Sequence, residues 1–211
     1  AHAFGVTYKG IGVGNFGDAT MFSFHATKCF HCIEGGAVAF HDAQYREKLH
    51  SLKNFGIHGP DDVIAIGGNA KLDEFRAAMG ICNLRRMDVC LQKRKAVYEK
   101  YYERLNNVEG IKISSIQENI CPNYAYFPVY FNKEIFGKDR NEIFSMLREH
   151  GIYTRKYFYP AVNDMKCYKE EYKNSYTPVA RDVSLNILAL PMYEELALSD
   201  VDRVCDLILK K

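Results

Sequence analysis

Lys28 is the residue of this chain best suited to covalent chemistry. It closes the polar run 23–28, with the hydroxyl of Ser23 five residues before it and the glycine pair Gly35 and Gly36 after it. This pattern suits pyridoxal 5′-phosphate (PLP), because its aldehyde bonds to a lysine amine and its phosphate needs hydroxyl and main-chain N–H donors. The competing interpretation is a surface lysine in a turn, which describes most lysines.

Two short strands are predicted on either side of this lysine. Residues 21–24 alternate as a strand does, and the apolar run Ala37–Phe40 reads as a second short strand. Lys28 then lies on the connection between them. A lysine with its ordinary pKa of about 10.4 is a poor base at neutral pH, so the site must lower that pKa by burial and by a cationic cofactor.

Much of the chain resembles one enzyme family. The run 22–36 resembles the lysine motif of the DegT/StrS-type sugar aminotransferases, which are PLP-dependent enzymes of the aspartate aminotransferase fold. Further blocks that resemble the family follow in the same order at residues 1–5, 14–18, 54–57, 68–74, 151–152, 157–160 and 190–193. The resemblance implies an α/β fold. Residues 1–90 would be the C-terminal half of the PLP-binding large domain, and residues 91–211 a linking helix and a small α+β domain.

The resemblance also implies roles for residues around the cofactor. Lys28 would bond to PLP and later carry a proton, Ser23 would donate to the phosphate, and His2 would contact the ring or its phenolic oxygen. Asn69 would reach the phosphate bound by the other subunit, which requires a homodimer with shared active sites. The alternatives are a strand serine that faces solvent for Ser23 and turn chemistry for Asn69. His25 is interpreted as structural, because alternation turns it away from the site.

A substrate site is predicted just before Pro160. Arg155, Lys156, Tyr157 and Tyr159 combine cations with aromatic rings, which suits a nucleotide diphosphate and a stacked base or sugar. The alternative is a tyrosine-rich loop that covers the core. With the resemblance, the cluster favours a nucleotide-sugar substrate, and His58 is a further candidate for the sugar pocket.

The resemblance implies transamination of a nucleotide-linked keto-deoxyhexose, typically with glutamate as amino donor. The product would be an amino sugar for surface polysaccharide, O-antigen or a glycosylated natural product. One alternative is a PLP-dependent sugar dehydratase, although a histidine replaces the lysine in those relatives. Another is a catalytically incomplete or regulatory relative that binds a sugar or a partner. In the family, an Asp pairs with the pyridine nitrogen of the cofactor. Its position, three residues before the one that matches His2, is outside this sequence.

The composition argues against several other classes of function. The chain has 28 basic and 26 acidic residues in 211, a net charge of +2, and no basic stripe that would predict nucleic-acid binding. No apolar run approaches the roughly 20 residues of a membrane helix. Residues 1–17 are too polar and glycine-rich for a signal peptide.

The cysteines predict reduced thiols rather than disulfides or a metal. There are seven, an odd number scattered along the chain, which favours a cytoplasmic protein. The run Cys29-Phe30-His31-Cys32 invites a zinc interpretation, but a second ligand pair at comparable spacing is missing from the sequence. We therefore predict no metal site.

One glycine motif suggests a different cofactor. Residues 12–17 spell G-x-G-x-x-G, the pattern of a dinucleotide-binding turn. That turn must open a helix, whereas residues 19–24 read as a strand. The sequence therefore predicts a tight turn here.

Patterning predicts most of the remaining elements. Helices are expected at Asp42–Lys53, Asp73–Arg86, Met87–Leu105, Asp139–His150, Thr177–Leu188 and Ser199–Leu209, and strands at Ile111–Ile113, Tyr124–Phe131 and Ile152–Arg155. Gly151 should end the helix before it, and Thr177 should cap the helix that begins with Pro178. Phe75, with its neighbours at helical spacing, should form an apolar stripe.

Overall fold

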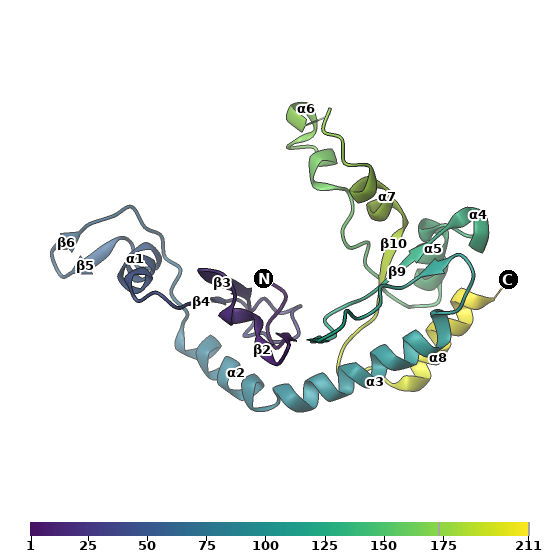
Figure 1. Ribbon diagram of the computed structural model, residues 1–211, viewed down its shortest axis with the longest axis horizontal. Helices are drawn as coiled ribbons and strands as arrows, with labels where there is room; N and C mark the ends of the chain where they lie inside the picture. Colours follow the sequence, from purple (N-terminus) through teal and green to yellow (C-terminus); the bar gives the residue numbers. More distant parts are fainter. Residues whose placement is uncertain (173, 211) are drawn as a thin grey trace. The chain divides into compact units, whose positions relative to one another are not determined.

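The structure is a computed structural model that describes residues 1–172 and 174–210. The chain forms two compact units, whose elements are labelled in Figure 1. Unit 1 comprises Ala1–Cys90 and Gln117–Asn123, and unit 2 comprises Leu91–Ile116 and Tyr124–Lys211. The segment Gln117–Asn123, called the return segment here, therefore belongs to unit 1 although residues of unit 2 precede and follow it.

Unit 1 is built from short antiparallel strands and helices. Its elements are β1 (Thr7–Tyr8), β2 (Ile11–Gly12), the 3-10 helix η1 (Val13–Asn15), β3 (Ala19–Ser23), β4 (Gly36–Phe40), α1 (Gln44–Lys53), β5 (Ile57–Gly59), β6 (Asp62–Val63), α2 (Glu74–Arg85) and β8 (Ile120–Cys121). β1 pairs with β2 and β8, β3 pairs with β4, and β5 pairs with β6. The β1–β8 pairing holds the return segment beside the start of the chain.

The two strands predicted around Lys28 are present as β3 and β4. They pair antiparallel, with Ser23 opposite Gly36 at the end that opens into the loop of residues 24–35. Gly36 has no room for a side chain, because a Cβ there would lie 2.7 Å from the main-chain oxygen of Phe22. The second glycine of the motif thus permits a close approach of the two strands.

The glycine-rich run 12–17 forms a turn, as predicted. η1 occupies its centre, Gly17 has a positive φ of 68°, and β3 begins at Ala19. A dinucleotide-binding turn would require a helix at this point, so the strand that follows is incompatible with that motif.

Helices α1 and α2 lie close to their predicted bounds. α2 begins after Asp73, whose carboxylate accepts a hydrogen bond from the N–H of Arg76 at 2.9 Å. Phe75, part of its predicted apolar stripe, is 91% exposed, and α2 has no buried residue. Phe75 therefore lies on the exposed side of α2.

Unit 2 combines a three-stranded sheet with helices. Its elements are α3 (Met87–Leu105), which begins in unit 1, then β7 (Ile111–Lys112), β9 (Phe127–Phe131), α4 (Lys133–Phe136), α5 (Arg140–Glu149), the 3-10 helix η2 (Val162–Asp164), α6 (Lys169–Tyr172), α7 (Pro178–Asn186), β10 (Ile187–Leu190) and α8 (Leu198–Leu209). The sheet is antiparallel in the order β10–β9–β7. Figure 1 shows α3 as one long helix and α8 lying along it.

The main hydrophobic core lies in unit 2. Phe127, Val129 and Phe131 of β9 are fully buried, and the residues between them are only partly covered. Helices α3, α5 and α8 contribute further buried side chains, among them Tyr101, Leu105, Ile143, Leu147, Val201 and Cys205. The alternation of β9 and the apolar faces of these helices therefore build this core together.

The structure corrects the prediction around Thr177. The helix expected over Thr177–Leu188 ends at Asn186, and the chain continues as β10, which pairs with β9. The Thr177 hydroxyl does not cap α7 but donates to Oδ1 of Asn163 at 3.3 Å. A short apolar run such as the one before Pro191 is compatible with helix or strand, and the free edge of β9 selects the strand.

The strand predicted at Ile152–Arg155 is also wrong. Only Arg155 pairs, through two main-chain hydrogen bonds with Ala189 of 3.1 and 2.8 Å. The helix before it is as predicted: α5 has Asp139 as its cap, and Gly151 follows with a φ of 76°. Local capping signals thus predicted the helix, whereas strand length depended on how much of a neighbouring edge was free.

All seven cysteines are free thiols, and the residues described contain no cluster of three or more potential metal ligands. Across residues 1–172 and 174–210, every helix is too short or too polar to cross a bilayer.

Candidate active site around Lys28

The loop that carries Lys28 is held by main-chain hydrogen bonds. The N–H of Lys28 donates to the carbonyl of His25 at 2.9 Å, and the N–H of Phe24 donates to Gly35 at 2.8 Å. The first bond makes a tight turn, and the second extends the β3–β4 ladder by one step. Lys28 is only partly exposed. The loop therefore presents its amine from a defined main-chain position.

The amine of Lys28 meets His2. Its Nζ lies 2.9 Å from Nε2 of His2. An ammonium group only donates, so Nε2 must accept and the imidazole proton must lie on Nδ1. Burial, followed by the Lys28 charge, lowers the pKa of His2 below its ordinary value of 6.5. His2 is therefore neutral at pH 7 and suited to accept this hydrogen bond.

Residues close to His2 in sequence pack against the Lys28 hairpin. The carbonyl of Ala1 accepts from the N–H of Ser23 at 2.9 Å. The ring of Phe4 stacks on Phe30 with centroids 4.4 Å apart and meets Phe22 edge-on at 5.6 Å. The start of the chain is thus attached to the hairpin on both sides of His2.

A residue that sequence reasoning missed completes this attachment. Asn123, at the end of the return segment, is 6% exposed. Its side-chain amide donates to the carbonyl oxygens of His2 at 2.8 Å and Phe4 at 2.9 Å. In the sequence, an asparagine after Pro122 indicates only a turn. No local signal connects it to a histidine 121 positions earlier.

Ser23 lies at the end of β3, where the Lys28 loop begins. Its Oγ accepts a long hydrogen bond of 3.4 Å from the N–H of His25. The hydroxyl proton of Ser23 is left to donate elsewhere, which is what a phosphate requires. His25 itself turns to other partners in the loop, since its Nδ1 lies 2.9 Å from Thr27 and its Nε2 lies 3.4 Å from Glu34.

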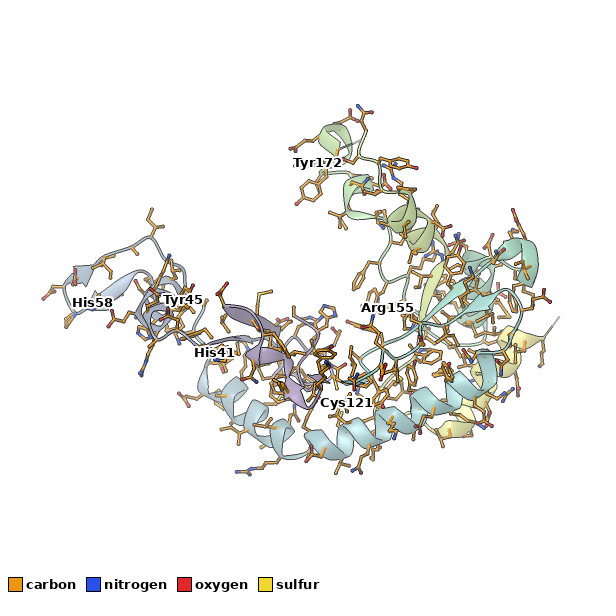
Figure 2. The ribbon with its side chains drawn as sticks, viewed as in Figure 1. His41, Tyr45, His58, Cys121, Arg155 and Tyr172 are labelled. Carbon is orange, nitrogen blue, oxygen red and sulfur yellow. The ribbon has the colours of Figure 1, made fainter. Side chains whose placement is uncertain are left out.

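Asn69 and His58 lie elsewhere in unit 1. Asn69 is exposed and forms a main-chain bridge with Asn54 after α1. His58 is on the β5–β6 hairpin, labelled in Figure 2, with its Nδ1 3.1 Å from the carboxylate of Asp62. Across the described part of the chain, neither side chain hydrogen-bonds to Lys28. A single chain does not bring these two predicted residues to the amine.

The predicted substrate residues lie in unit 2 and point to different neighbours. Arg155, labelled in Figure 2, is exposed beside β10. Tyr157 meets Tyr126 edge-on at 5.7 Å, and Tyr159 lies over the guanidinium of Arg140 at 4.9 Å. Two aromatic side chains of the cluster therefore pack within unit 2, while the cation of Arg155 remains accessible.

Lys156 also contacts residues of unit 2. Its Nζ donates to Oδ1 of Asn141 at 2.5 Å and lies 4.5 Å from the centre of the Phe144 ring. Burial, and then the charge of Arg140, lower the pKa of Lys156. This lysine contacts α5, so the four predicted substrate residues do not form one surface.

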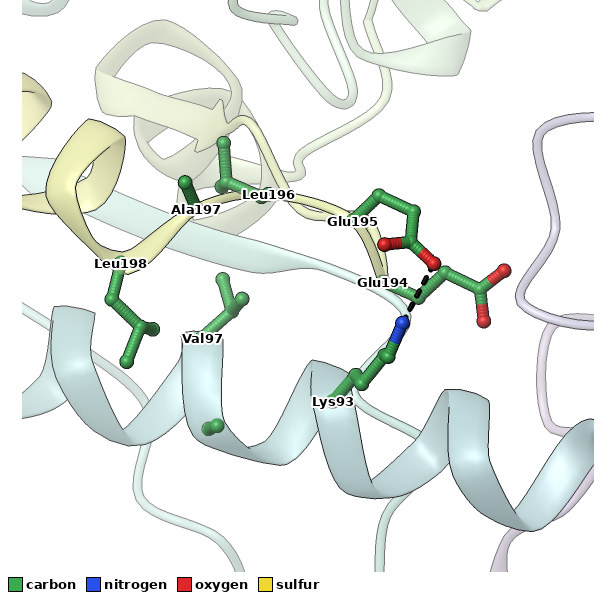
Figure 3. Close-up of a pocket in the computed structure, with 8 residues that line it drawn as sticks. Lys93, Val97, Glu194, Glu195, Leu196, Ala197 and Leu198 are labelled. Carbon is green, nitrogen blue, oxygen red and sulfur yellow. Dashed lines mark hydrogen bonds and ion pairs between the residues drawn. The ribbon is translucent and has the colours of Figure 1, made fainter.

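The hollow in Figure 3 involves none of these residues. It is lined by α3 and by the segment that leads into α8, and the Lys93–Glu195 ion pair of 2.7 Å crosses it. Both charged groups are largely exposed, so the pair contributes little to stability.

Comparison with known proteins gives consistent results. The chain is 36% identical over 201 residues to a dTDP-4-amino-4,6-dideoxy-D-glucose transaminase of Shigella dysenteriae, covering 95% of this chain and 54% of that protein. It resembles the crystal structure of DesI in the presence of its TDP-sugar product, with a TM-score of 0.89, 30% identity, and coverage of 99% and 53% of the two chains. For S. venezuelae DesV in complex with a ketimine intermediate, the TM-score is 0.90, the identity 27%, and the coverage 99% and 55%.

The chain spans about half the length of these relatives. Their structures confirm the α/β fold of PLP-dependent sugar aminotransferases that the sequence predicted. The pattern of the DegT/DnrJ/EryC1/StrS aminotransferase family matches residues 1–209. This chain belongs to the DegT/DnrJ/EryC1/StrS aminotransferase family.

Proposed function

We propose that the protein is a PLP-dependent aminotransferase that acts on a nucleotide-linked keto-deoxyhexose. The observation that carries the proposal is the 2.9 Å contact between the amine of Lys28 and a neutral His2. Ser23 lies at the start of the loop that carries Lys28. Relatives named as dTDP-sugar transaminases support the substrate class. Glutamate is proposed as amino donor, and an amino sugar for surface polysaccharide or O-antigen as the product.

The residues present fit PLP. Among the described residues, no carboxylate pairs with Lys28, so its amine is available to bond to an aldehyde. The hydroxyl of Ser23 can donate to the phosphate, and His2 can orient the amine or contact the ring. When bound, PLP supplies an electron sink that stabilises negative charge at the substrate carbon.

The chain's own contribution is the placement and movement of protons. His2 accepts a hydrogen bond from Nζ of Lys28 without carrying charge, so it orients the amine and does not repel it. The free Nζ of Lys28 would carry a proton between the substrate carbon and the cofactor. Ser23 would hold the phosphate of PLP through its hydroxyl.

We propose the same division of the chain as the sequence predicted. Residues 1–90 would belong to the PLP-binding large domain, and residues 91–211 would be the linking helix and the small domain, except that the return segment packs with unit 1. Arg155 is the exposed cation best placed to bind a nucleotide diphosphate, and Tyr159 adds an aromatic face beside Arg140. Lys156, which contacts Asn141, and Tyr157, which packs against Tyr126, would also contribute to substrate binding.

A homodimer with shared active sites accounts for Asn69 and His58. Both are exposed, and neither bonds to Lys28 within one chain, which supports a role toward the partner subunit. The amide of Asn69 would then donate to the phosphate bound by the other copy. Free thiols at all seven cysteines support activity in the reducing cytoplasm.

The test is covalent capture of PLP in the complete gene product. Borohydride reduction followed by mass spectrometry should locate the adduct at Lys28, and the adduct should be lost in Lys28→Ala but retained in Lys48→Ala, a change of an exposed lysine on α1. Amino transfer from glutamate to a dTDP-linked keto-deoxyhexose should follow the same pattern. Labelling spread over many lysines, with Lys28 no more reactive than the others, would contradict the proposal.

A further inference from the structure

Asn123 connects the two members of the Lys28–His2 pair from a distant part of the chain. Its amide donates to the main-chain oxygens of His2 at 2.8 Å and Phe4 at 2.9 Å. The main-chain carbonyl oxygen of Asn123 accepts a hydrogen bond of 3.4 Å from Sγ of Cys29, the residue after Lys28. We propose that Asn123 is a positioning residue that keeps His2 and Lys28 within hydrogen-bonding distance. The inference rests on the function proposed above for Lys28.

The bonds that Asn123 makes leave little freedom on either side. A primary amide has two N–H groups, and here there is one acceptor for each. The Asn123 residue is 6% exposed and Cys29 is 9% exposed. Water therefore has little access to compete for these bonds, and loss of the amide would leave two carbonyl oxygens without this donor.

The position of Asn123 is set independently of the site. In the return segment, Cys121 pairs with Thr7 and Ile120 pairs with Tyr8 in the β1–β8 ladder. The main chain that leads to Asn123 is thus attached to the sheet before its side chain reaches His2. The main chain at Asn123 is therefore held by the β1–β8 ladder. The side-chain amide then holds His2 relative to that fixed main chain.

An asparagine meets these demands, and its closest substitutes do not. Aspartate has nearly the same shape, but an ionised carboxylate only accepts, so it would face two carbonyl oxygens with no proton between them. Leucine also has a similar shape, with neither donor nor charge. Asn123→Asp and Asn123→Leu therefore remove the donated bonds with little change in volume.

The control is Asn119→Asp on the same return segment. Asn119 is exposed and has a φ of 64°, a conformation that aspartate tolerates nearly as well as asparagine. Asn119→Asp adds the same charge as Asn123→Asp at a position away from the pair. All variants are made in the complete gene product.

The first readout needs no cofactor and follows the titration of His2 by NMR. Burial and the Lys28 ammonium lower the pKa of His2 in the wild type, so separation of the pair should raise it towards 6.5. Both Asn123→Leu and Asn123→Asp should raise the pKa of His2. Because leucine adds no charge, a rise in Asn123→Leu excludes the carboxylate of Asn123→Asp as the cause. The control should leave the pKa of His2 unchanged.

The second readout is the fraction of PLP captured at Lys28. We expect both changes at Asn123 to lower it about tenfold, and Asn119→Asp to stay within about twofold of the wild type. A wild type that captures no PLP at Lys28 refutes the proposed function, while the titration of His2 still decides the role of Asn123. Wild-type capture together with unchanged titration in both variants overturns the inference.

A measurement on the wild type covers the case in which the variants do not fold. The side-chain amide protons of Asn123 should exchange with water at least about tenfold more slowly than those of exposed Asn119. Equal exchange rates would show that the amide does not hold these bonds, and would overturn the inference.

Discussion

Nζ of Lys28 and Nε2 of His2 lie 2.9 Å apart, although 26 positions separate the two residues. Burial and the Lys28 charge lower the pKa of His2, so the imidazole stays neutral and accepts the hydrogen bond. The contact gives the amine a defined direction. It also makes the site sensitive to protonation of a single group.

Capture of PLP at Lys28 should therefore lose efficiency in acid. As the pH falls below 6.5 and through the lowered pKa of His2, the imidazole gains a proton, can no longer accept at Nε2 and repels the Lys28 ammonium. His2→Gln keeps an acceptor that does not titrate. The borohydride-captured fraction, measured from about pH 8 to pH 5, should show a step in the wild type that is absent from His2→Gln. Parallel profiles would contradict this role.

Gly36→Ala should weaken the hairpin that carries Lys28. Its Cβ would lie 2.7 Å from the main-chain oxygen of Phe22, so the strands must separate, and we expect a loss of about 1–3 kcal/mol in the free energy of unfolding. Gly80→Ala is the control. Gly80 lies inside α2, where the nearest atom to its Cβ is Cβ of Cys32 at an ordinary 3.5 Å. That change should be neutral or stabilising by up to about 1 kcal/mol in urea denaturation.

The core of unit 2 allows a comparison between two isoleucines. Ile143 is fully buried on α5, whereas Ile135 on α4 is 53% exposed. Ile143→Ala should cost about 2–5 kcal/mol, because it removes apolar contacts and leaves a cavity. Ile135→Ala should stay within about 0.5 kcal/mol of the wild type. Similar midpoints in urea denaturation for the two variants would show that α5 does not pack in the core of unit 2 as described.

The cap of α5 should contribute a stability that depends on pH. Asp139 accepts from the N–H groups of Asn141 and Glu142, and its other oxygen lies 2.9 Å from Lys133. The bond from Glu142, then Lys133, lower the pKa of Asp139 below 3.8. At neutral pH, Asp139→Ala should cost about 0.5–2 kcal/mol.

The sign of the pH dependence follows from the lowered pKa. Because the folded carboxyl titrates below its unfolded value of 3.8, the stabilisation is present above that pH and is lost as the pH falls through the folded pKa. Asp139→Asn keeps an acceptor that does not titrate. Its difference from the wild type in urea denaturation should narrow below about pH 4, and a constant difference would contradict the assignment.

Local signals in the sequence were sufficient to predict helices α1, α2, α3, α5 and α8. The aspartates before α2 and α5 accept hydrogen bonds from the first turns, and Gly151 follows α5 with a positive φ. Each of these signals involves residues only a few positions apart, so the sequence shows all of the groups that form it. Thr177 is an exception, because a tertiary partner, Asn163, takes its hydroxyl.

The strands were less predictable, because each depends on an edge supplied by another segment. The first two residues of β10, Ile187 and Leu188, were assigned to a helix, since this apolar run fits either state until β9 offers an edge. The opposite error occurred at Ile152–Arg155, where only Arg155 finds a partner in Ala189. β8 was missed because two residues of pairing with β1 leave almost no pattern.

The candidate site divides in the same way. The type and spacing of Ser23 and Lys28 were enough to predict an amine on a loop between two strands, because a hairpin is a local structure. The contacts of that amine were not accessible from spacing. His2 reaches it across 26 positions and Asn123 supports the pair from 94 positions beyond Cys29, and such separations are closed only when the β1–β8 pairing and the Phe4 cluster bring the segments together. A linear pattern records which groups exist, whereas their distances depend on the folded path between them.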